Sequence, residues 1–355
     1  MKIALIGRYG EGDILPGPER VARELYKQLK KKNVDVTFIE YFFSGYNDYS
    51  FLRKIFGSKV NEDGILRLGI LPLTIKLLRE QFDVIHFINS QRFSLAVFFI
   101  KPLLKAKFLS TLHGLNKIEA KELRLKRKFL DVWVEKITIK KSDLLIFPSA
   151  YLIDLFMNYY SLAGKNEVIH NGISDLFFKN RISFIKKDVY NFIYFHSFNK
   201  GLDELINHYL KEVNLPLRIF AIGKDITIKS NNRNIEIINV SPMNHFSLIE
   251  FLSDKHFIIK SSFIDSFSII SVECMAMGII PIVSENIGVK EIIDNKINGF
   301  IYNSNDKENL LLLLRDIYEG KYNLQKISLN ASKTTERLSW ENVSEKYIQL
   351  YKFIV

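Results

Sequence analysis

Short apolar runs alternate with amphipathic segments along the first half of the chain. The apolar runs predict buried strands, and apolar residues at helical spacing predict helices. Strands are expected at residues 2–6, 34–39, 83–88, 108–112, 143–147 and 167–169. Helices are expected between them, at residues 19–31, 71–81, 92–104, 117–141 and 150–160. Because strands that alternate with helices form parallel sheets, we expect this half to be a parallel sheet with helices on both faces.

The same rhythm restarts after residues 171–188, a mixed segment that we interpret as a linker. Strands are expected at residues 192–195, 217–222, 235–240, 257–259 and 280–283. Helices are expected at residues 201–211, 244–252, 269–277, 289–294, 307–319, 324–337 and 340–353. The pattern predicts an α/β protein with two sheet-and-helix domains and a cleft between them. In such sheets ligands bind beyond the carboxyl ends of the strands.

The composition excludes several classes of protein. Of the 355 residues, 47% are hydrophobic and 25% are charged, which is typical of a folded soluble protein. The single cysteine, Cys274, excludes a disulfide scaffold and is interpreted as a packed, unreactive thiol. The seven histidines show no metal-binding spacing, so no metal is expected. We find neither a signal peptide nor an apolar run of the roughly 20 residues that span a bilayer, which favours a cytoplasmic protein.

Positive charge is concentrated in the first half of the chain. Residues 1–170 hold 28 basic and 18 acidic residues, whereas residues 171–355 hold 22 and 21. This asymmetry indicates an anionic partner for the first half, and a solvated lysine-rich surface would explain it equally well. Residues 117–141 place basic side chains beside apolar ones. That pattern is typical of a helix on an anionic membrane surface, and also of a packed helix with a solvated face.

The candidate chemistry lies in residues 265–301. A polar loop, Asp265 to Ser268, runs directly into an apolar helix. The first N–H groups of a helix have no internal partner and lie at its positive end, so such a start can bind a phosphate. Glu273 follows about one turn later among apolar residues, where a carboxylate needs a partner or the edge of a cleft. Together these groups suit a phosphorylated ligand that carries sugar hydroxyls.

This stretch resembles the donor-binding segment of retaining GT-B glycosyltransferases of the family 4 type. Their signature is a pair of acidic residues separated by seven others, here Asp265 and Glu273, followed by a small-residue helix, a glycine, a proline and a strand, here residues 275–284. Further matches in the family's order are residues 17–21, 111–114, 143–149, 168–173, 288–293, 298–300 and 339–341, with Tyr347 and Tyr351.

The resemblance implies a GT-B fold with two Rossmann-like, doubly wound domains. Residues 1–172 would form the acceptor-side domain, with the C-terminal helix 340–355 packed back on it. Residues 173–339 would form the donor domain, which binds the nucleotide sugar. The implied reaction moves a sugar, with retention, from a UDP- or GDP-linked donor to a cell-envelope glycan or lipid-linked acceptor. No cofactor or metal is implied, and the enzyme would work in the cytoplasm or peripherally on the inner face of the membrane.

The resemblance also assigns residue roles. Glu273 would accept hydrogen bonds from the donor ribose, and Asp265 would hold a hydroxyl of the donor sugar. Lys200 would neutralise the leaving diphosphate, and His113 would lie near the transferred sugar. The remaining donor-binding residues implied by the match are Gly17, His196, Ser266, Phe267, Ser268 and Ile269, with backbone amides around Ser268 and that of Gly17 on the diphosphate.

Three departures from the family pattern keep an alternative open. Asp265 replaces the usual glutamate, and Pro16 and Pro18 flank Gly17. Where the family has an arginine, residues 194–197 contain none, and His196 is a poor substitute for a permanent cation. A catalytically weak or inactive nucleotide-sugar-binding protein is therefore the second hypothesis, and an epimerase or a phosphorylase of the same architecture is another. A basic nucleic-acid-binding protein is less favoured, because no binding module is evident, so no nucleic acid is expected as a partner.

Overall fold

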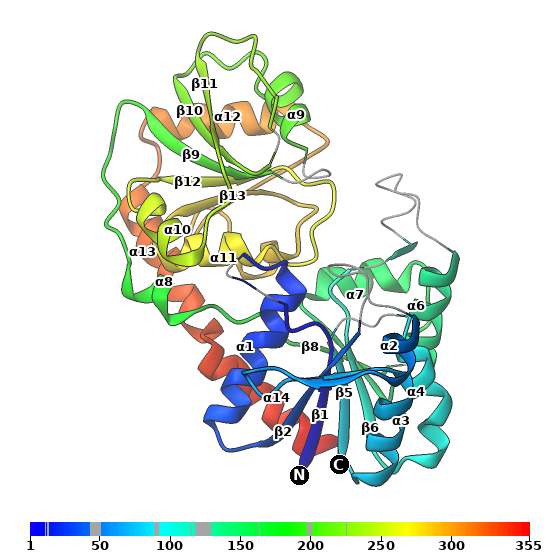
Figure 1. Ribbon diagram of the computed structural model, residues 1–355. Helices are drawn as coiled ribbons and strands as arrows, with labels where there is room; N and C mark the ends of the chain where they lie inside the picture. The colour runs from blue at the N-terminus through cyan, green and yellow to red at the C-terminus, as the bar shows by residue number, and fades with distance from the viewer. Residues whose placement is uncertain are drawn as a thin grey trace. The chain divides into compact units, whose positions relative to one another are not determined.

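The computed structural model describes residues 1–355 except 11, 13, 43–50, 89–91, 115, 118–128, 163, 197–200 and 225. The chain divides into two compact units, residues 1–172 with 340–355 and residues 173–339. Each unit is built on its own mainly parallel sheet (Figure 1). The α/β prediction is confirmed.

Unit 1 contains, among its described residues, an eight-stranded sheet in the order β3-β4-β2-β1-β5-β6-β7-β8. Every neighbouring pair is parallel except β3 and β4. The strands are β1 Lys2–Ile6, β2 Asp35–Tyr41, β3 Ser58–Val60, β4 Leu66–Leu68, β5 Val84–Ile88, β6 Lys107–Thr111, β7 Leu144–Phe147 and β8 Asn166–Val168. The central strands β1 and β5 are almost fully buried, as their largely apolar sequences require.

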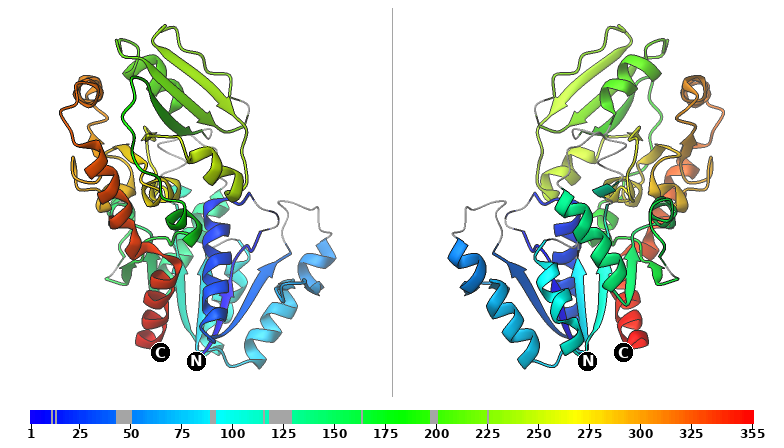
Figure 2. Two further views of the ribbon diagram at one scale, coloured as in Figure 1. Left: turned by 90° about the vertical axis from the view of Figure 1, so that its left-hand side faces the viewer. Right: turned by 90° about the vertical axis from the view of Figure 1, so that its right-hand side faces the viewer.

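Helices cover the sheet of unit 1. They are α1 Gly17–Lys31, α2 Phe51–Phe56, α3 Ile70–Arg79, α4 Ser94–Ile100, the 3₁₀ turn η1 Lys101–Leu103, α6 Phe129–Lys141, α7 Ala150–Met157 and the C-terminal α14 Trp340–Ile354. Helix α14 packs beside α1, and the two views of Figure 2 agree with this arrangement. A Cβ added at Gly172 would lie 2.4 Å from Cδ2 of Trp340, so only a glycine lets the chain pass the first residue of α14.

Unit 2 contains, within the described residues, a six-stranded parallel sheet in the order β11-β10-β9-β12-β13-β14. The strands are β9 Tyr190–Phe195, β10 Leu217–Ile222, β11 Ile235–Val240, β12 Phe257–Lys260, β13 Ile280–Ser284 and β14 Phe300–Tyr302. The helical elements are α8 Asp175–Lys179, α9 Leu202–Glu204, η2 Leu205–Tyr209, α10 His245–Leu252, α11 Ile269–Ala276, η3 Gly288–Ile292, α12 Lys307–Tyr318, α13 Leu324–Thr335 and η4 Glu336–Leu338.

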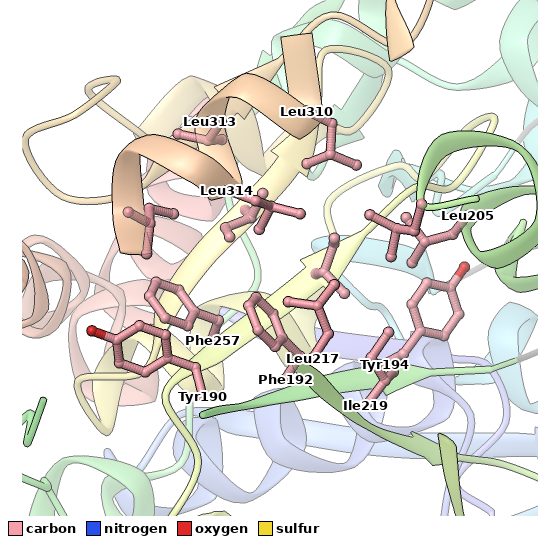
Figure 3. Packing of buried hydrophobic residues seen from close by; sticks show 14 of the residues in the cluster. Tyr190, Phe192, Tyr194, Leu205, Leu217, Ile219, Phe257, Leu310, Leu313 and Leu314 are labelled. Carbon is pink, nitrogen blue, oxygen red and sulfur yellow. The ribbon is translucent and has the colours of Figure 1, made fainter. Parts of the chain in front are cut away.

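One face of this sheet forms a core rich in aromatic rings. Phe192 and Phe257 stack with ring centroids 5.1 Å apart, and Tyr190 meets Phe257 edge-on at 5.3 Å. Leucines of α12, including Leu310 and Leu314, pack in the same cluster (Figure 3). Burial of this apolar area against the sheet stabilises unit 2, which has a second buried apolar cluster that includes Phe267 and Val272.

Several expected elements differ in the structure. The helix expected at residues 201–211 is short and continues as a π turn, Leu205–Tyr209, whose wider winding buries Leu205, Ile206 and Tyr209 together. The helix expected at residues 289–294 is a 3₁₀ turn, Gly288–Ile292, tightened by the bond from the Ile293 N–H to the Lys290 carbonyl. The long helix expected from residue 117 lies partly outside the described residues, and α6 begins at Phe129.

The sequence also left elements unassigned. Helix α2 and strands β3 and β4 are short, and their exposed or half-buried residues give little periodic signal. The expected linker contains α8, whose Ser174 caps the helix by accepting the Leu176 N–H. The single cysteine behaves as predicted: Cys274 is fully buried, and burial raises the pKa of its thiol well above the usual value.

Candidate functional site

The start of α11 in unit 2 is an open helix terminus. Ser268 precedes it in the left-handed conformation with φ 59°, and no side chain caps the helix. The Ser268 N–H donates to Oδ1 of Asp265 at 3.1 Å, which holds the loop in a tight turn. Ile269 and Ile270 are half-buried, and their N–H groups donate to no hydrogen bond within the described residues. The positive end of the helix dipole at this point can bind an anion without a side-chain cation.

Glu273 lies one turn along the same helix and is 1% exposed. It is the one charged residue of α11, between Val272 and Cys274, which are both fully buried. A buried carboxylate so close to an open helix start is costly for folding unless polar groups meet it. This placement suits a group that accepts hydrogen bonds from a ligand bound at the helix start.

Asp265 is oriented from two directions. Besides accepting the Ser268 N–H, its Oδ2 lies 3.6 Å from Nζ of Lys260, the last residue of β12. Both side chains are largely buried, with 3% of Lys260 and 13% of Asp265 exposed. Sequence reasoning missed Lys260 because the strand was expected to end at Ile259. The signal was present, since a lysine that continues a buried apolar strand needs a counter-charge.

The carboxyl ends of β9 and β12 are neighbours in the sheet, and His196 follows β9. The His196 N–H donates to the Ile222 carbonyl at 2.8 Å. Its Nδ1 is buried and has no hydrogen-bond partner within the described residues. Lys200, the candidate partner of a leaving diphosphate, lies outside the described residues. Phe267 is fully buried in the core, so this residue can offer a ligand only its backbone.

In unit 1, Gly17 is the first residue of α1, and no side chain caps that helix either. The loop before it is held by Arg23, a residue that sequence reasoning missed. Its guanidinium donates to the carbonyls of Tyr9, Gly10 and Gly12 at 3.3, 2.7 and 3.1 Å. It also lies over the Tyr9 ring, 5.0 Å from the centroid. One side chain thus holds the carbonyls of three described residues that precede α1.

His113 follows β6 at the carboxyl edge of the same sheet. Its Nε2 is buried and has no hydrogen-bond partner among the described residues, and burial lowers the pKa of the imidazole to about 4. Below it, His86 of β5 is fully buried, with Nδ1 2.7 Å from Tyr351 Oη and Nε2 2.7 Å from Thr111 Oγ1. Burial, with His113 nearby, lowers the pKa of His86 to about 3. Both rings are neutral at neutral pH.

We expect His86 to make the protein less stable in acid. Its folded-state pKa is below the unfolded value of 6.5, so the unfolded chain binds the proton more readily. Stability is therefore complete above pH 6.5 and is lost progressively as the pH falls towards 3. At pH 5 the loss from this group is about 2 kcal/mol. Thermal unfolding of His86→Gln should depend less on pH between 7 and about 5 than that of the wild type. The exposed His208→Gln is the control, and equal slopes for all three proteins would contradict the prediction.

The described part of the chain contains no group of three or more His, Cys, Asp or Glu side chains that could hold a metal ion. Every helix in that part is too short or too polar to cross a lipid bilayer.

Two family models match this chain and together span most of it. The model described as Glycosyltransferase Family 4 matches residues 16–175, and the model described as Glycosyl transferases group 1 matches residues 179–334. The chain belongs to the family 4 type of glycosyltransferases. The resemblance inferred from residues 265–301 is thereby confirmed.

The fold of this glycosyltransferase is similar to that of solved structures. A sucrose-phosphate synthase of Thermosynechococcus elongatus gives a TM-score of 0.79 at 16% identity, over 99% of this chain and 98% of that chain. Anabaena HepE in complex with UDP-glucose gives 0.71 at 13% identity, over 99% and 100%. These likenesses establish the GT-B fold. An uncharacterised 41.2 kDa protein from the cps region of Klebsiella pneumoniae is 23% identical over 302 residues, 80% of this chain and 83% of that protein.

The glycosyltransferase thus has its candidate residues in two sets. Contacts within unit 2 bring Asp265, Ser268 and Lys260 together at the start of α11, with Glu273 on that helix and His196 at the same edge of the sheet. Gly17 and His113 belong to unit 1.

Proposed function

We propose that the protein transfers a sugar, with retention, from a UDP- or GDP-linked donor to a cell-envelope glycan or lipid-linked acceptor. The observation that carries the proposal is the open start of α11, with the buried Glu273 one turn further on. A diphosphate fits the helix terminus, and a pentose attached to it would reach the carboxylate. The reaction needs no metal in this scheme and takes place in the cytoplasm or peripherally on the inner face of the membrane.

The residues have distinct roles in the proposed reaction. Glu273 accepts hydrogen bonds from the ribose, and Asp265, held by Lys260, accepts one from a hydroxyl of the sugar. The amides around Ser268 bind the diphosphate. Lys200 stabilises the negative charge that grows on the leaving diphosphate, an interaction that lowers the barrier because it strengthens in the transition state.

Two relatives support the substrate classes. HepE was solved with UDP-glucose, which favours a uridine or related nucleotide sugar as donor. The Klebsiella protein comes from the cps region, which favours a cell-envelope glycan as the product. Neutral His113 at the carboxyl edge of β6 suits a hydrogen bond to the transferred sugar, because a neutral imidazole both donates and accepts.

A carboxylate placed at the start of α11 tests the proposal. Ser266→Asp should remove the thermal stabilisation that UDP, GDP or their sugars give the wild type, because it sets a negative charge against the diphosphate. The same change should leave the ligand-free protein as stable as before or slightly more stable, since an anion at a helix start is favourable by about 0.3–1 kcal/mol. Loss of binding would then not be a consequence of unfolding.

Two variants serve as controls for this experiment. Ser266→Ala removes the hydroxyl without adding charge, and Ser247→Asp adds the same charge near the start of α10, where Asn244 already caps the helix. Both should keep the stabilisation by nucleotide. If Ser266→Asp binds nucleotides as the wild type does, the proposed donor site is misplaced.

A specific observation favours a second candidate, a nucleotide-sugar-binding protein with little or no catalysis. The chain has Tyr194, Phe195 and His196 where the family has an arginine. Neither tyrosine nor phenylalanine carries a positive charge, and Tyr194 of β9 is in addition fully buried. Stabilisation by a nucleotide sugar without release of the free nucleoside diphosphate, in the presence of envelope glycan acceptors, would favour this candidate.

A further inference from the structure

Exposed apolar side chains are concentrated on a helical flank of unit 1. Helix α3 exposes Leu71, Ile75 and Leu78, which share one face of the helix and are 44%, 40% and 44% exposed. At the end of α4 and in η1, Phe99 is 73% exposed and Leu103 is 71% exposed. Helices α2, α3, α4 and α6 lie next to one another along this flank of the larger sheet (Figure 1). Large apolar side chains grouped in this way mark an interaction surface.

Two hollows meet at η1. One hollow lies on the α3 side. Most of its lining residues are apolar, among them Leu78, Phe82 and Leu103, and Gln81 and Lys105 also line it. The basic hollow lies on the α6 side, with a volume of about 360 Å³, and is lined by Lys101, Pro102, Leu104, Lys140, Lys141, Ser142, Asp143 and Lys165. Leu104 lines both hollows. An apolar depression therefore adjoins a cationic one on the same surface.

Basic residues outnumber acidic ones around these hollows. Helices α2, α3 and α4 with η1 carry no acidic residue, and their basic residues are Arg53, Lys54, Lys76, Arg79 and Lys101. Asp143, the acid of the basic hollow, is already paired with Lys101 at 2.7 Å. Within the described part of the chain, Lys140, Lys141 and Lys165 form no ion pair. Three exposed ammonium groups are thus available to an anionic partner.

We propose that this basic apolar surface, formed by Leu78, Phe99, Leu103, Lys140, Lys141 and Lys165, binds an anionic lipid bilayer. The lysines hold the negatively charged headgroups, and the apolar side chains enter the boundary between headgroups and acyl chains. Lys107 and Leu144 are the first residues of β6 and β7, so this surface lies at the amino ends of these strands. His113 lies at the opposite edge of the sheet, where the strands have their carboxyl ends. Membrane contact would leave that carboxyl edge uncovered.

The pairing of charge with apolar exposure selects a bilayer over other anionic or apolar partners. A nucleic acid would use the lysines but would give no reason for exposed Phe99 and Leu103. A second copy of the chain in a symmetric contact would cover the apolar side chains but would bring the unpaired lysines of both copies together. A bilayer with anionic headgroups satisfies both features. The inference rests on the membrane location given under the proposed function. Its test uses no sugar, so failure to bind vesicles would leave the proposed sugar transfer untouched.

Sedimentation with lipid vesicles tests the proposal. The wild-type protein should bind vesicles of phosphatidylcholine with phosphatidylglycerol at low salt, and bind poorly to phosphatidylcholine alone. Lys140→Gln/Lys141→Gln/Lys165→Gln should lower the partition coefficient about a hundredfold, since each basic residue near an anionic surface contributes roughly a factor of five. Phe99→Ser/Leu103→Ser should lower it about tenfold, because less apolar area enters the interface.

Matched variants of unit 2 are the controls. Lys211→Gln/Lys229→Gln/Lys326→Gln removes the same charge from other exposed positions, and Phe246→Ser/Leu312→Ser removes exposed apolar side chains. Both control variants should bind the vesicles as strongly as the wild-type protein does. The proposal is overturned if the two lysine triples weaken binding equally. It is also overturned if Phe99→Ser/Leu103→Ser changes the oligomeric state in light scattering but not the vesicle binding, or if RNA and not lipid is bound through Lys140, Lys141 and Lys165.

Discussion

Glu273→Gln is expected to abolish the thermal stabilisation that a nucleoside diphosphate sugar gives the wild-type protein. A carboxylate can accept two hydrogen bonds from the vicinal hydroxyls of a ribose, and bonds to a charged acceptor contribute about 1.5–3 kcal/mol each. The amide has nearly the same shape but one acceptor oxygen and no charge. We therefore expect donor affinity to fall by a factor of about 100 or more, measured by titration calorimetry or thermal shift.

The burial of Glu273 makes this substitution easy to interpret. Because the side chain is 1% exposed and glutamine has nearly the same shape as glutamate, the substitution should keep the packing of α11 and the fold of the ligand-free protein. Glu250→Gln, at an exposed position of α10 in the same unit, should keep the wild-type response. An unchanged nucleotide shift in Glu273→Gln would show that the ribose binds elsewhere, even if the fold is intact.

The sequence predicted the parts of the fold that depend on local pattern. Strands β1 and β5 are short, mostly apolar runs, and α1 has its buried residues at helical spacing, so both kinds of element were expected close to their observed positions. Asp265 and Glu273 could be recognised as candidate site residues, because acidic residues just before and within an apolar helix are unusual. Short edge elements such as β3 and β4 were missed, since their positions are set by pairing and not by their own side chains.

The contacts that orient the candidate site depend on the folded chain. Arg23 lies within a helix in the sequence, and nothing local indicates that it holds three carbonyls of a loop more than ten residues earlier. In the sequence, His86 has no feature that sets it apart from other strand residues. Its contact with Tyr351 of α14, 265 positions away in the sequence, forms only in the folded chain. The pairing of Lys260 with Asp265 requires that the chain turn back between β12 and α11. A single sequence gives no distance information of this kind.

The pair formed by Lys260 and Asp265 is expected to couple stability to donor binding. Lys260→Met keeps the length of the buried side chain but removes the ammonium that lies 3.6 Å from Oδ2 of Asp265. The Asp265 carboxylate, which is 13% exposed, then still accepts the hydrogen bond from the Ser268 N–H but loses the counter-charge of Lys260. Removal of one partner from a buried ion pair costs about 3 kcal/mol or more, so the variant should unfold at a temperature lower by about 10 °C in calorimetry.

A double-mutant cycle separates the charge effect from packing. Lys260→Met/Asp265→Asn removes both charges and should recover much of the stability lost in Lys260→Met, because an uncompensated buried charge is the main cost. Ligand binding gives an independent readout. Lys260 orients Asp265, which is proposed to hold the sugar of the donor and does not contact its nucleotide in the proposed site. Lys260→Met should therefore bind UDP as the wild type does, while the additional affinity of the nucleotide sugar over UDP is lost. If UDP and its sugar weaken equally, Asp265 supports the loop before α11 and does not contact the sugar.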